Sequence, residues 1–349
     1  MNLQETAELL NIEARGPADY PVKGVRDIER LSDDQGLEEN YIYFIESRAV
    51  FKRHPKTAER GAVLTIPALA DNFRQALVAP ERDVRLAFIK LLRHFDNRPV
   101  FQPGISPQAL VHPSAKIAES AVVLEGVIVM EGATIGARCT LYPGVVVEPF
   151  AEIGEGAILY PCVVIGHHCV IGKNDIIHGG TVIGADGFGF YDQPGQRYKI
   201  PHIGNVIIDE NVEIGASCTV DRATIESTRI GAYTKLDDQV HVGHNSQLGR
   251  FIYVVGNSAI GGSVTVGDGA MISGMVIIKD HLKIAAGSII MGMSGVAQDT
   301  EPKTAYFGIP ARPAKQMHRM HSALEKLPEL LAKVRELEEI LKNPVPSRG

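Results

Sequence analysis

Two histidines and a pair of glycines in the second half of the chain could take part in acid–base chemistry. His244 lies within the polar segment DDQVHVGHNSQLG (237–249), His281 follows it, and Gly261 and Gly262 lie between them. An unperturbed imidazole titrates near neutral pH and can therefore act as a general base. A glycine can turn its backbone N–H toward a developing oxyanion, because no side chain shields it. These residues predict a site that moves a proton and stabilises negative charge.

A six-residue repeat of aliphatic residues predicts the scaffold that positions them. Thirteen positions spaced six apart from Val111 to Ile183 are all Val, Ile or Leu, and the spacing returns at twelve positions from Ile230 to Val296. This period suits a β-solenoid in which each hexad forms one strand and one corner, and three hexads form one coil. The fifth position of each hexad from 115 to 181 is small, except at Asp175. Hexapeptide-repeat proteins, which this stretch resembles, form a left-handed parallel β-helix, and we expect that fold.

The repeat also predicts where the two histidines lie. His244 is the third residue of the hexad that starts at Val242, so its imidazole should project from the wall. His281 is the fourth residue of the hexad that starts at Ile278, and the 36 residues from Val242 to Ile278 are two whole coils. The histidines should therefore share a face, about 10 Å apart at a strand spacing of ~4.8 Å. That separation is too large for shared metal ligation but suits a base and a separate substrate contact.

The sequence pattern divides the chain into three parts. Residues 1–100 lack the hexads and mix helical with strand periodicity, which predicts a small α/β domain. Residues 101–310 carry the predicted β-helix, and a glycine-rich loop over 185–206 must leave its wall, where recognition is expected. Residues 311–349 have apolar side chains at three- and four-residue steps up to Leu341, and Pro328 near the first turn of a second helix. We expect C-terminal helices whose apolar face packs on the solenoid end or on symmetry mates.

Composition and charge exclude several classes of protein. Hydrophobic residues make up 45% of the chain but aromatics only 6%, which fits a thin repetitive core. The net charge of −6 argues against a nucleic-acid partner. No apolar run approaches the ~20 residues needed to span a bilayer, and the N-terminus lacks the pattern of a signal peptide. We therefore expect a cytoplasmic protein without a transmembrane segment, with peripheral contact with the inner membrane left open.

The cysteines do not suggest a metal site. Three of them occupy the small fifth position of a hexad and are interpreted as core fillers: Cys139, Cys169 and Cys218. Cys162 has no CxxC partner. The adjacent His167 and His168 are interpreted as solvated corner residues. The sequence therefore predicts no bound metal.

Three segments, in this order within the repeats, resemble the UDP-3-O-acylglucosamine N-acyltransferases of lipid A biosynthesis: GADGFGF (184–190), KIPHIGNVIIDENVEIGASCTVDRATI (199–225) and KLDDQVHVGHN (235–245). The likeness extends to YFGIPARP (306–313) and, more weakly, to VKGVRDIERL (22–31). It implies an enzyme that moves a 3-hydroxyacyl chain from acyl carrier protein to the 2-amino group of UDP-3-O-acylglucosamine. It implies no cofactor, since the phosphopantetheine thioester of the carrier is itself a substrate.

The resemblance also implies roles for individual residues. His244 is the general base, in its neutral form, because an imidazolium cannot accept a proton. The Gly262 N–H stabilises the tetrahedral oxyanion. Substrate contacts are implied for His281, Asn245, Phe44, Phe51, Asp238, Gln239, Phe188 and Phe190. Members of this family form homotrimers whose clefts hold the active sites. The tail would dock the acidic carrier through positive charge at Lys303, Arg312, Lys315 and Arg319.

The chain departs from the family pattern at two places. Family members usually carry a Phe-Leu-x-Asn-Pro-x-Tyr-like segment whose aromatics stack on uracil, whereas residues 44–51 read FIESRAVF. Phe44 matches, and Phe51 replaces the Tyr after a one-residue shift. Asp238 stands where Asn is frequent and Gly243 where Ala is usual, and we expect both to lie beside the proposed base. A changed sugar or acyl donor therefore stays open.

Three other functions compete with this interpretation. An O-acyltransferase of the same pathway or an acetyl-CoA-dependent sugar N-acetyltransferase is disfavoured by the separate N-terminal domain and by the GADGFGF loop. A zinc hydratase of the carbonic anhydrase type uses two histidines five residues apart, and no two of the twelve histidines here have that spacing. A solenoid scaffold without catalysis predicts that replacing His244 changes nothing measurable.

Overall fold

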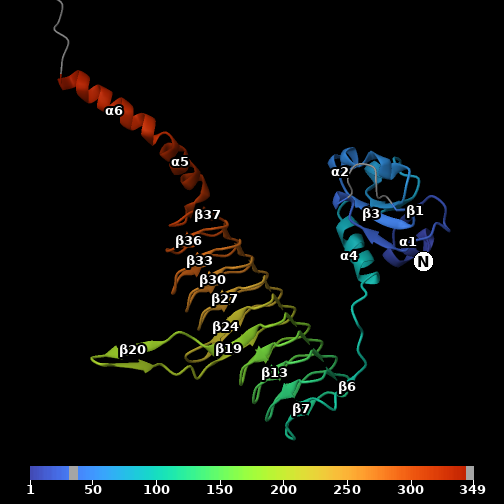
Figure 1. Cartoon of the computed structure of the whole chain (residues 1–349), viewed down its shortest axis with the longest axis horizontal. Coiled ribbons are helices and arrows are strands. Elements are labelled where there is room, and N and C mark those ends of the chain that lie inside the picture. Colours follow the sequence, from blue (N-terminus) through green and yellow to red (C-terminus); the bar gives the residue numbers. More distant parts are fainter. Residues whose placement is uncertain (31–37, 343–349) are drawn as a thin grey trace, which may run out of the picture. The chain divides into compact units, whose positions relative to one another are not determined.

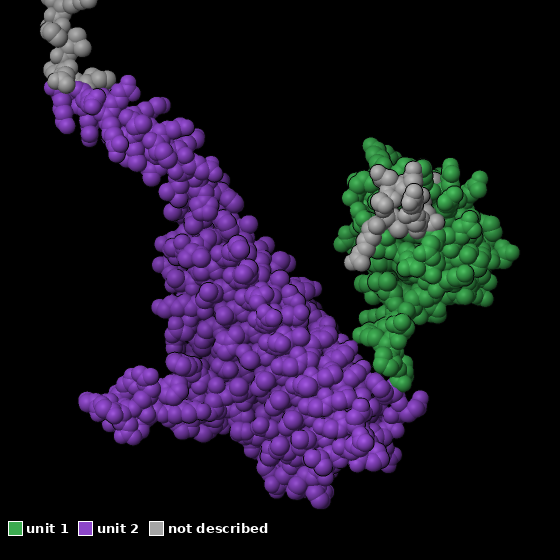
Figure 2. Space-filling model, in the orientation of Figure 1, with its two compact units in different colours: residues 1–100 green, residues 101–349 purple. Residues whose placement is uncertain are grey.

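The computed structural model describes residues 1–30 and 38–342, and it divides into two compact units, residues 1–100 and 101–349 (Figures 1 and 2). Residues 343–349, where the predicted C-terminal helices end, lie outside the described residues. The same holds for Leu31 of the VKGVRDIERL segment and for the side chain of Leu341. Each unit is described by itself.

The first unit is a small α/β domain, as the mixed periodicity predicted. Its five-stranded sheet has the order β1-β5-β4-β3-β2, with β1 antiparallel and the other strands parallel. The strands are β1 Glu13–Arg15, β2 Gly24–Arg26, β3 Tyr41–Ile45, β4 Ala62–Thr65 and β5 Ala76–Val78. The helices are α1 Leu3–Leu10, α2 Arg48–Arg53, α3 Pro67–Ala70 and α4 Val84–His94, with short 3₁₀ turns at Ile28–Arg30 and Pro55–Ala58. Helix α1 begins at Asn2, whose side chain accepts the N–H of Glu5 in a capping box.

The second unit is the predicted left-handed parallel β-helix, built from three sheets that we name after one strand each. The β27 sheet contains β7 Leu110–Val111, β10 Ile128–Val129, β13 Val146–Val147, β16 Val164–Ile165, β19 Val182–Asp186, β24 Thr219–Arg222, β27 His241–Val242, β30 Ala259–Ile260, β33 Ile277–Ile278 and β36 Gly295–Val296. The β28 sheet contains β8 Lys116–Ile117, β11 Thr134–Ile135, β14 Glu152–Ile153, β17 Val170–Ile171, β22 Asn205–Ile208, β25 Ser227–Ile230, β28 Gln247–Leu248, β31 Thr265–Val266 and β34 Lys283–Ile284.

The third sheet, the β26 sheet, closes each coil. It contains β6 Gly104–Ile105, β9 Val122–Val123, β12 Thr140–Leu141, β15 Ile158–Leu159, β18 Ile176–Ile177, β23 Glu213–Ile214, β26 Lys235–Leu236, β29 Tyr253–Val254, β32 Met271–Ile272, β35 Ile289–Ile290, β37 Ala305–Phe307 and β38 Arg312–Pro313. Strands of successive coils pair in parallel, and Val242, Ile260 and Ile278 lie in register. This register confirms that the hexads at 242 and 278 are two coils apart on one face.

The core contains the aliphatic residues of the repeat together with the small residues two positions before them. Val242, Ile260 and Ile278 are buried, as predicted for inward positions. Cys139, Cys169 and Cys218 are also buried, and burial raises the pKa of each thiol. The interpretation of these three cysteines as core fillers is therefore confirmed.

Asp175, the exception to the small-residue rule, lies in the coil that precedes the glycine-rich loop. Strand β17 pairs with β22 through Val170 and Ile207 alone. The Asp175 carboxylate accepts the N–H groups of Gly172 and Val212, each at 2.8 Å, and so joins two coils where the backbone ladder is incomplete. Burial raises the pKa of Asp175 to about 7.

Asp175 predicts a specific dependence of stability on pH. Between the unperturbed pKa of 3.8 and about 7, the folded chain holds a proton that the unfolded chain has released. Raising the pH through this window should therefore lower the free energy of unfolding of the wild type relative to Asp175→Ser, by up to about 1.4 kcal/mol per pH unit. Urea denaturation of both proteins at about pH 5, 6 and 7 measures the difference. A difference that does not change with pH would contradict this assignment.

The loop predicted over 185–206 leaves the wall as a hairpin of β20 Phe190–Gln193 and β21 Gln196–Lys199, which projects from the β-helix (Figure 1). The buried Arg222 guanidinium fixes both ends of this loop, donating to Gly184 O at 2.7 Å and to Gly204 O at 3.2 Å. It also donates to His167 O at 3.1 Å and contacts the His167 ring. His167 is an exposed corner residue, as predicted, and it also contacts Arg222.

The tail forms two helices, α5 Ala314–Glu325 and α6 Leu327–Lys342, and Pro328 lies in the first turn of α6 as predicted. Met317 is buried beside Gly308, where a Cβ would lie 2.2 Å from Cε of Met317. The other large apolar side chains of described exposure in the tail are exposed, among them Met320, Leu324, Leu331, Val334 and Leu337. The tail packs on the solenoid end through Met317 and through the rings of His318 and His321, which lie 5.7 and 5.6 Å from the Phe307 ring. Over residues 1–30 and 38–342, no helix combines the length and the apolar character needed to cross a membrane.

Candidate active site

His244, Gly262 and His281 lie at one corner of the β-helix in three successive coils. They follow strands β27, β30 and β33, which are neighbours in the β27 sheet. The N–H of Ser263 donates to His244 O at 2.8 Å, and the N–H of His281 donates to Gly262 O at 2.9 Å. The half-buried imidazole of His244 lies outside the aliphatic core, which contains Val242. The hexad pattern therefore brings these residues together as predicted.

Asn245 fixes the tautomer of His244. The Asn245 side chain accepts the N–H of Thr224 through Oδ1 at 2.9 Å and donates through Nδ2 to Ile225 O at 3.0 Å, which identifies its oxygen. His244 Nδ1 lies 3.1 Å from that oxygen and must therefore carry a hydrogen. In the neutral ring this leaves a lone pair on Nε2, which is the form that a general base needs. Asn245, predicted to contact substrate, thus has both polar atoms engaged with the protein.

Thr224 and Ile225 belong to the second irregularity of the repeat, where ten residues separate Val220 from Ile230 instead of six. The extra residues extend the connection between β24 and β25. Their backbone supplies one donor and one acceptor to Asn245. The irregularity therefore helps to position the imidazole of His244.

Two glycines lie directly against the His244 ring. A Cβ added at Gly262 would lie 2.8 Å from Nε2 of His244, and one added at Gly187 would lie 2.7 Å from its Cδ2. Both distances are too short for a side chain, so the ring needs glycine on both sides. Among the hydrogen bonds of the described residues, none is donated by the N–H of Gly262. The Gly262 N–H is therefore not taken up by an acceptor among the described residues, and Gly262 lies beside Nε2 of His244.

Three further ionisable residues surround His244, and the sequence analysis missed them: His202, Asp221 and His241. The His202 and His244 rings meet edge to face with centroids 5.2 Å apart. His241 Nε2 lies 3.7 Å from Asp221 Oδ2, and its Nδ1 lies 2.8 Å from Thr219 Oγ1. His202 and Asp221 lie within segments that carry the family resemblance. However, His202 lies in the loop and Asp221 in the extended coil, where no hexad periodicity predicts that they contact His244.

Asp221 is a buried carboxylate among imidazoles. Desolvation raises its pKa, while the positive charge of His241, His244 and His202 lowers it and the charge of Asp186 raises it further. Lys199 pairs with Asp186, and this ion pair lowers the pKa of Asp186. The site therefore contains one buried carboxylate that interacts electrostatically with three histidines.

Asp238 and Gln239 lie at a different corner from His244, between β26 and β27. The expectation that Asp238 lies beside the base was therefore wrong within one folded chain, because strand β27 separates the two corners. Asp238 Oδ1 accepts the N–H of Ala216 at 2.6 Å. The N–H of Gln239 donates to Ala216 O at 2.9 Å, and its side chain is exposed.

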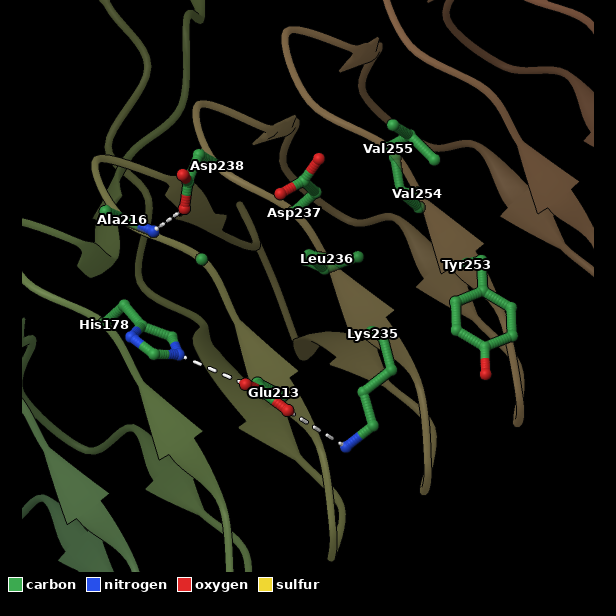
Figure 3. A pocket seen from close by; sticks show the side chains of 11 residues that line it. His178, Glu213, Ala216, Lys235, Leu236, Asp237, Asp238, Tyr253, Val254 and Val255 are labelled. Atoms are coloured by element: carbon green, nitrogen blue, oxygen red, sulfur yellow. Dashed lines mark hydrogen bonds and ion pairs between the residues drawn. The ribbon is translucent and has the colours of Figure 1, made fainter. Parts of the chain in front are cut away.

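Asp238 is part of a cavity of about 570 Å³ on the β26 sheet (Figure 3). Across its floor His178 Nε2 lies 3.2 Å from Glu213 Oε1, and Glu213 Oε2 lies 3.7 Å from Lys235 Nζ. Tyr253 and Val255 form the opposite side. This cavity combines charged and aromatic side chains and is exposed in the single chain.

The remaining predicted residues of the second unit lie on the surface. His281 keeps 74% of its side chain exposed, with Asp280 at 3.8 Å. Phe188 is 87% exposed and meets Phe190 edge to face at 5.1 Å at the base of the hairpin. On the tail, Lys315 and Arg319 line a shallow groove along α5, and Arg312 donates to Gln298 at 3.0 Å. Within the part of the chain that the structure describes, no side-chain interaction joins these residues to His244.

In the first unit, Phe44 and Phe51 are not a pair. Phe44 lines a cavity of about 540 Å³ and stacks on Phe88 at 4.3 Å, and Arg26 and Glu46 lie at the same cavity. Phe51 packs edge to face on Phe73 at 5.2 Å and does not line the cavity. The expectation that Phe51 replaces the second aromatic was wrong, because it faces a different neighbour. The aromatic partner of Phe44 is Phe88.

No group of three or more His, Cys, Asp or Glu with the geometry of a metal site is present in residues 1–30 and 38–342.

No family model matches the chain. The chain is 30% identical over 341 residues to a protein of Pseudomonas syringae pv. tomato named UDP-3-O-acylglucosamine N-acyltransferase, covering 97% of this chain and 95% of that protein. A protein of the same name from Rhizobium meliloti is 51% identical over 138 residues, 39% of each chain.

Among solved structures, the chain is similar to a UDP-N-acetylglucosamine acyltransferase of Francisella novicida. The identity is 28%, the alignment covers 60% of this chain and 69% of that one, and the TM-score is 0.48.

Proposed function

The chain belongs to the UDP-3-O-acylglucosamine N-acyltransferase family, and on that premise we propose how its residues carry out the transfer. The protein is an acyltransferase of lipid A biosynthesis that acylates the 2-amino group of UDP-3-O-acylglucosamine. The proposal concerns the catalytic residues, the acyl donor, the assembly and the nucleotide site.

His244 acts as the general base. Its Nε2 takes a proton from the 2-amino group as the nitrogen attacks the thioester carbonyl carbon and the C–N bond forms. The negative charge that develops on the carbonyl oxygen is stabilised by the N–H of Gly262. When the C–S bond breaks, the imidazolium returns the proton to the leaving thiolate, so that the base is restored. The observation that carries this proposal is the Asn245 oxygen, which leaves the lone pair of His244 on Nε2 beside Gly262.

The donor is a 3-hydroxyacyl chain on acyl carrier protein, and no resident cofactor is required. Lys315 and Arg319 lie on one groove of α5 with Met320, which suits an acidic protein carrying an apolar cargo. Arg312 precedes this helix and extends the positive surface. Acyl carrier protein and nucleotide sugars are cytoplasmic, and we propose the same location for the enzyme, with any contact with the inner membrane being peripheral.

The donor is tested by presenting purified protein and UDP-3-O-acylglucosamine with 3-hydroxyacyl carrier proteins of graded chain length, or with acetyl-CoA. We expect transfer from the carriers, with a maximum at one chain length, and no transfer from acetyl-CoA. Faster transfer from acetyl-CoA than from any carrier would contradict the proposal and favour a sugar N-acetyltransferase.

The active enzyme is a homotrimer. In one chain the base and the Asp238 cavity lie at separate corners, and both are open to a neighbouring copy. A threefold arrangement places one corner of each chain against another corner of the next chain, as heterologous interfaces do when a ring closes. Asp238 and Gln239 of one copy then serve the base of the next. Light scattering should give three times the mass of one chain, whereas a monomer active at high dilution would contradict this arrangement.

The cavity of the first unit binds the uracil ring through Phe44. Base stacking on an aromatic ring is worth about 1–3 kcal/mol, so Phe44→Ala should raise KM for the UDP-sugar about tenfold and leave kcat nearly unchanged. Steady-state kinetics at saturating donor measures both constants. Phe51→Leu is the matched control, because Phe51 contacts Phe73 and lies outside the cavity. Equal rises in KM for both variants would contradict the assignment.

A further inference from the structure

The imidazole of His202 is buried in the loop beside the base, with one nitrogen unpaired. His202 precedes β22 in the sequence, and only 5% of the residue is exposed. Nδ1 lies 3.0 Å from Ile200 O, and because a carbonyl can only accept, Nδ1 carries the hydrogen. Nε2 of the neutral ring is therefore a hydrogen-bond acceptor. It is buried and has no partner among the described residues.

The glycines of the GADGFGF segment form the slot that holds this ring. A Cβ at Gly189 would lie 3.0 Å from Cε1 of His202, and a Cβ at Gly187 would lie 2.8 Å from its Nε2. The same Cβ at Gly187 would lie 2.7 Å from Cδ2 of His244. Nε2 of His202 and Cδ2 of His244 therefore both lie beside Gly187. The unpaired Nε2 of His202 is thus buried close to the ring of the base, with the two ring centroids 5.2 Å apart.

The charged neighbours of the two rings come from four elements. Asp221 of β24, His241 of β27, Asp186 of β19 and Lys199 of β21 lie around them. Asp186 is paired with Lys199, and Asp221 lies close enough to His202 and His244 for its pKa to respond to both. In the proposed reaction His244 is the ring that takes the proton, because its Nε2 lies beside Gly262.

We propose that His202 is a positioning residue for His244: its ring holds the imidazole in place, and its unpaired Nε2 favours the imidazolium that His244 becomes during transfer. This inference rests on the proposed role of His244 as the base. A buried, unpaired acceptor close to a neighbouring imidazole stabilises positive charge there without exchanging a proton. The glycine spacing of the GADGFGF segment is then a requirement of this contact, because a side chain at Gly187 would separate the two rings.

Two amide variants separate the lone pair from simple packing. His202→Gln places an amide oxygen near the position of Nε2, whereas His202→Asn reaches only the position of Nδ1 and keeps a donor for Ile200 O. The probe is diethyl pyrocarbonate, which modifies neutral imidazoles, with the modification of His244 followed by peptide mass spectrometry across a pH series. This readout needs no substrate. His168→Phe is the control, because His168 stacks on Phe150 three coils before His244.

We expect the pH of half-maximal modification of His244 to fall by about one unit in His202→Asn and to stay near the wild-type value in His202→Gln and His168→Phe. In the transfer assay His202→Asn should lower kcat about tenfold with KM within about twofold of the wild type, and His202→Gln should recover most of kcat. If His202 only packs against His244, both variants should lower the thermal stability and leave the pH of half-maximal modification of His244 unchanged. That result, or equal losses in the two amides, would overturn the inference.

The two proposals fail in different ways. A wild-type protein without N-acyl transfer would overturn the proposed role of the base, yet the modification of His244 would still measure its interaction with His202. Normal transfer with no shift in His202→Asn would overturn the role of His202 alone. If His202→Asn does not fold, His202→Leu, which also places no acceptor at the position of Nε2, gives the same comparison with His202→Gln.

Discussion

Replacement of His244 with alanine is expected to lower kcat by about 10²–10⁴-fold while the β-helix stays folded. The imidazole lies outside the aliphatic core, so its loss removes the base without opening a cavity in the solenoid. The measurement is the rate of acyl transfer at saturating substrates, together with circular dichroism and the melting temperature. KM should change little, because the attacking amine and not the nucleotide or the acyl chain contacts Nε2.

His168→Ala provides the control for this prediction. His168 is also an exposed corner histidine, and it stacks on Phe150 at 5.1 Å, away from Gly262. Its removal should leave the rate unchanged. A scaffold without catalysis predicts equal behaviour of the two variants, and an undiminished rate in His244→Ala would remove the basis for a general base at this corner.

Gly262→Ala is expected to lower kcat by about 10²-fold for a different reason. The added Cβ would lie 2.8 Å from Nε2 and 3.0 Å from Cε1 of His244, and the ring cannot simply turn away while Asn245 holds Nδ1. The base must move, or the corner that carries the Gly262 N–H must move. Displacements near 1 Å in a catalytic arrangement, or loss of one oxyanion donor, each cost about two orders of magnitude. Transfer kinetics at several pH values measures the loss.

A second glycine separates this effect from a general need for glycine at corners. Gly274 also follows a strand of the β-helix, but a Cβ there would lie 3.4 Å from Gly256 O, its nearest neighbour. Gly274→Ala should therefore keep both fold and rate. If Gly274→Ala and Gly262→Ala lose activity equally, the corner backbone and not the base explains the loss.

The hexads predict the catalytic corner because their register is set by burial. A slip by one residue would expose Val242, Ile260 and Ile278 and bury their polar neighbours, so the aliphatic spacing alone aligns the coils. His244 and His281 follow these residues, and their shared face could be derived before the structure was known. The same argument identified Asp175 as an exception.

The rest of the site could not be derived, because it depends on segments without a period. His202 reaches His244 only through the path of the loop between β19 and β22, which no spacing predicts. Asn245 bonds to the extended coil at Thr224, so its role depends on an irregularity. Asp238 is six residues from His244 in the sequence but lies at another corner, since β27 runs between them.

The N-terminal aromatics and the tail show the same limit. Phe44 was identified from its segment, but its partner Phe88 comes from α4, and only tertiary packing joins α4 to β3. An amphipathic pattern predicted the helices α5 and α6 correctly, yet periodicity identifies an apolar face and not what covers it.

Transfer to the amine is measured by following one labelled 3-hydroxyacyl chain from carrier protein to UDP-3-O-acylglucosamine and treating the product with mild alkali, which cleaves esters and spares amides. We expect the wild-type protein to leave the label on the sugar after alkali, and His244→Ala to leave almost none. Label released by alkali, or retained equally with His244→Ala, would contradict transfer to the amine with His244 as its base.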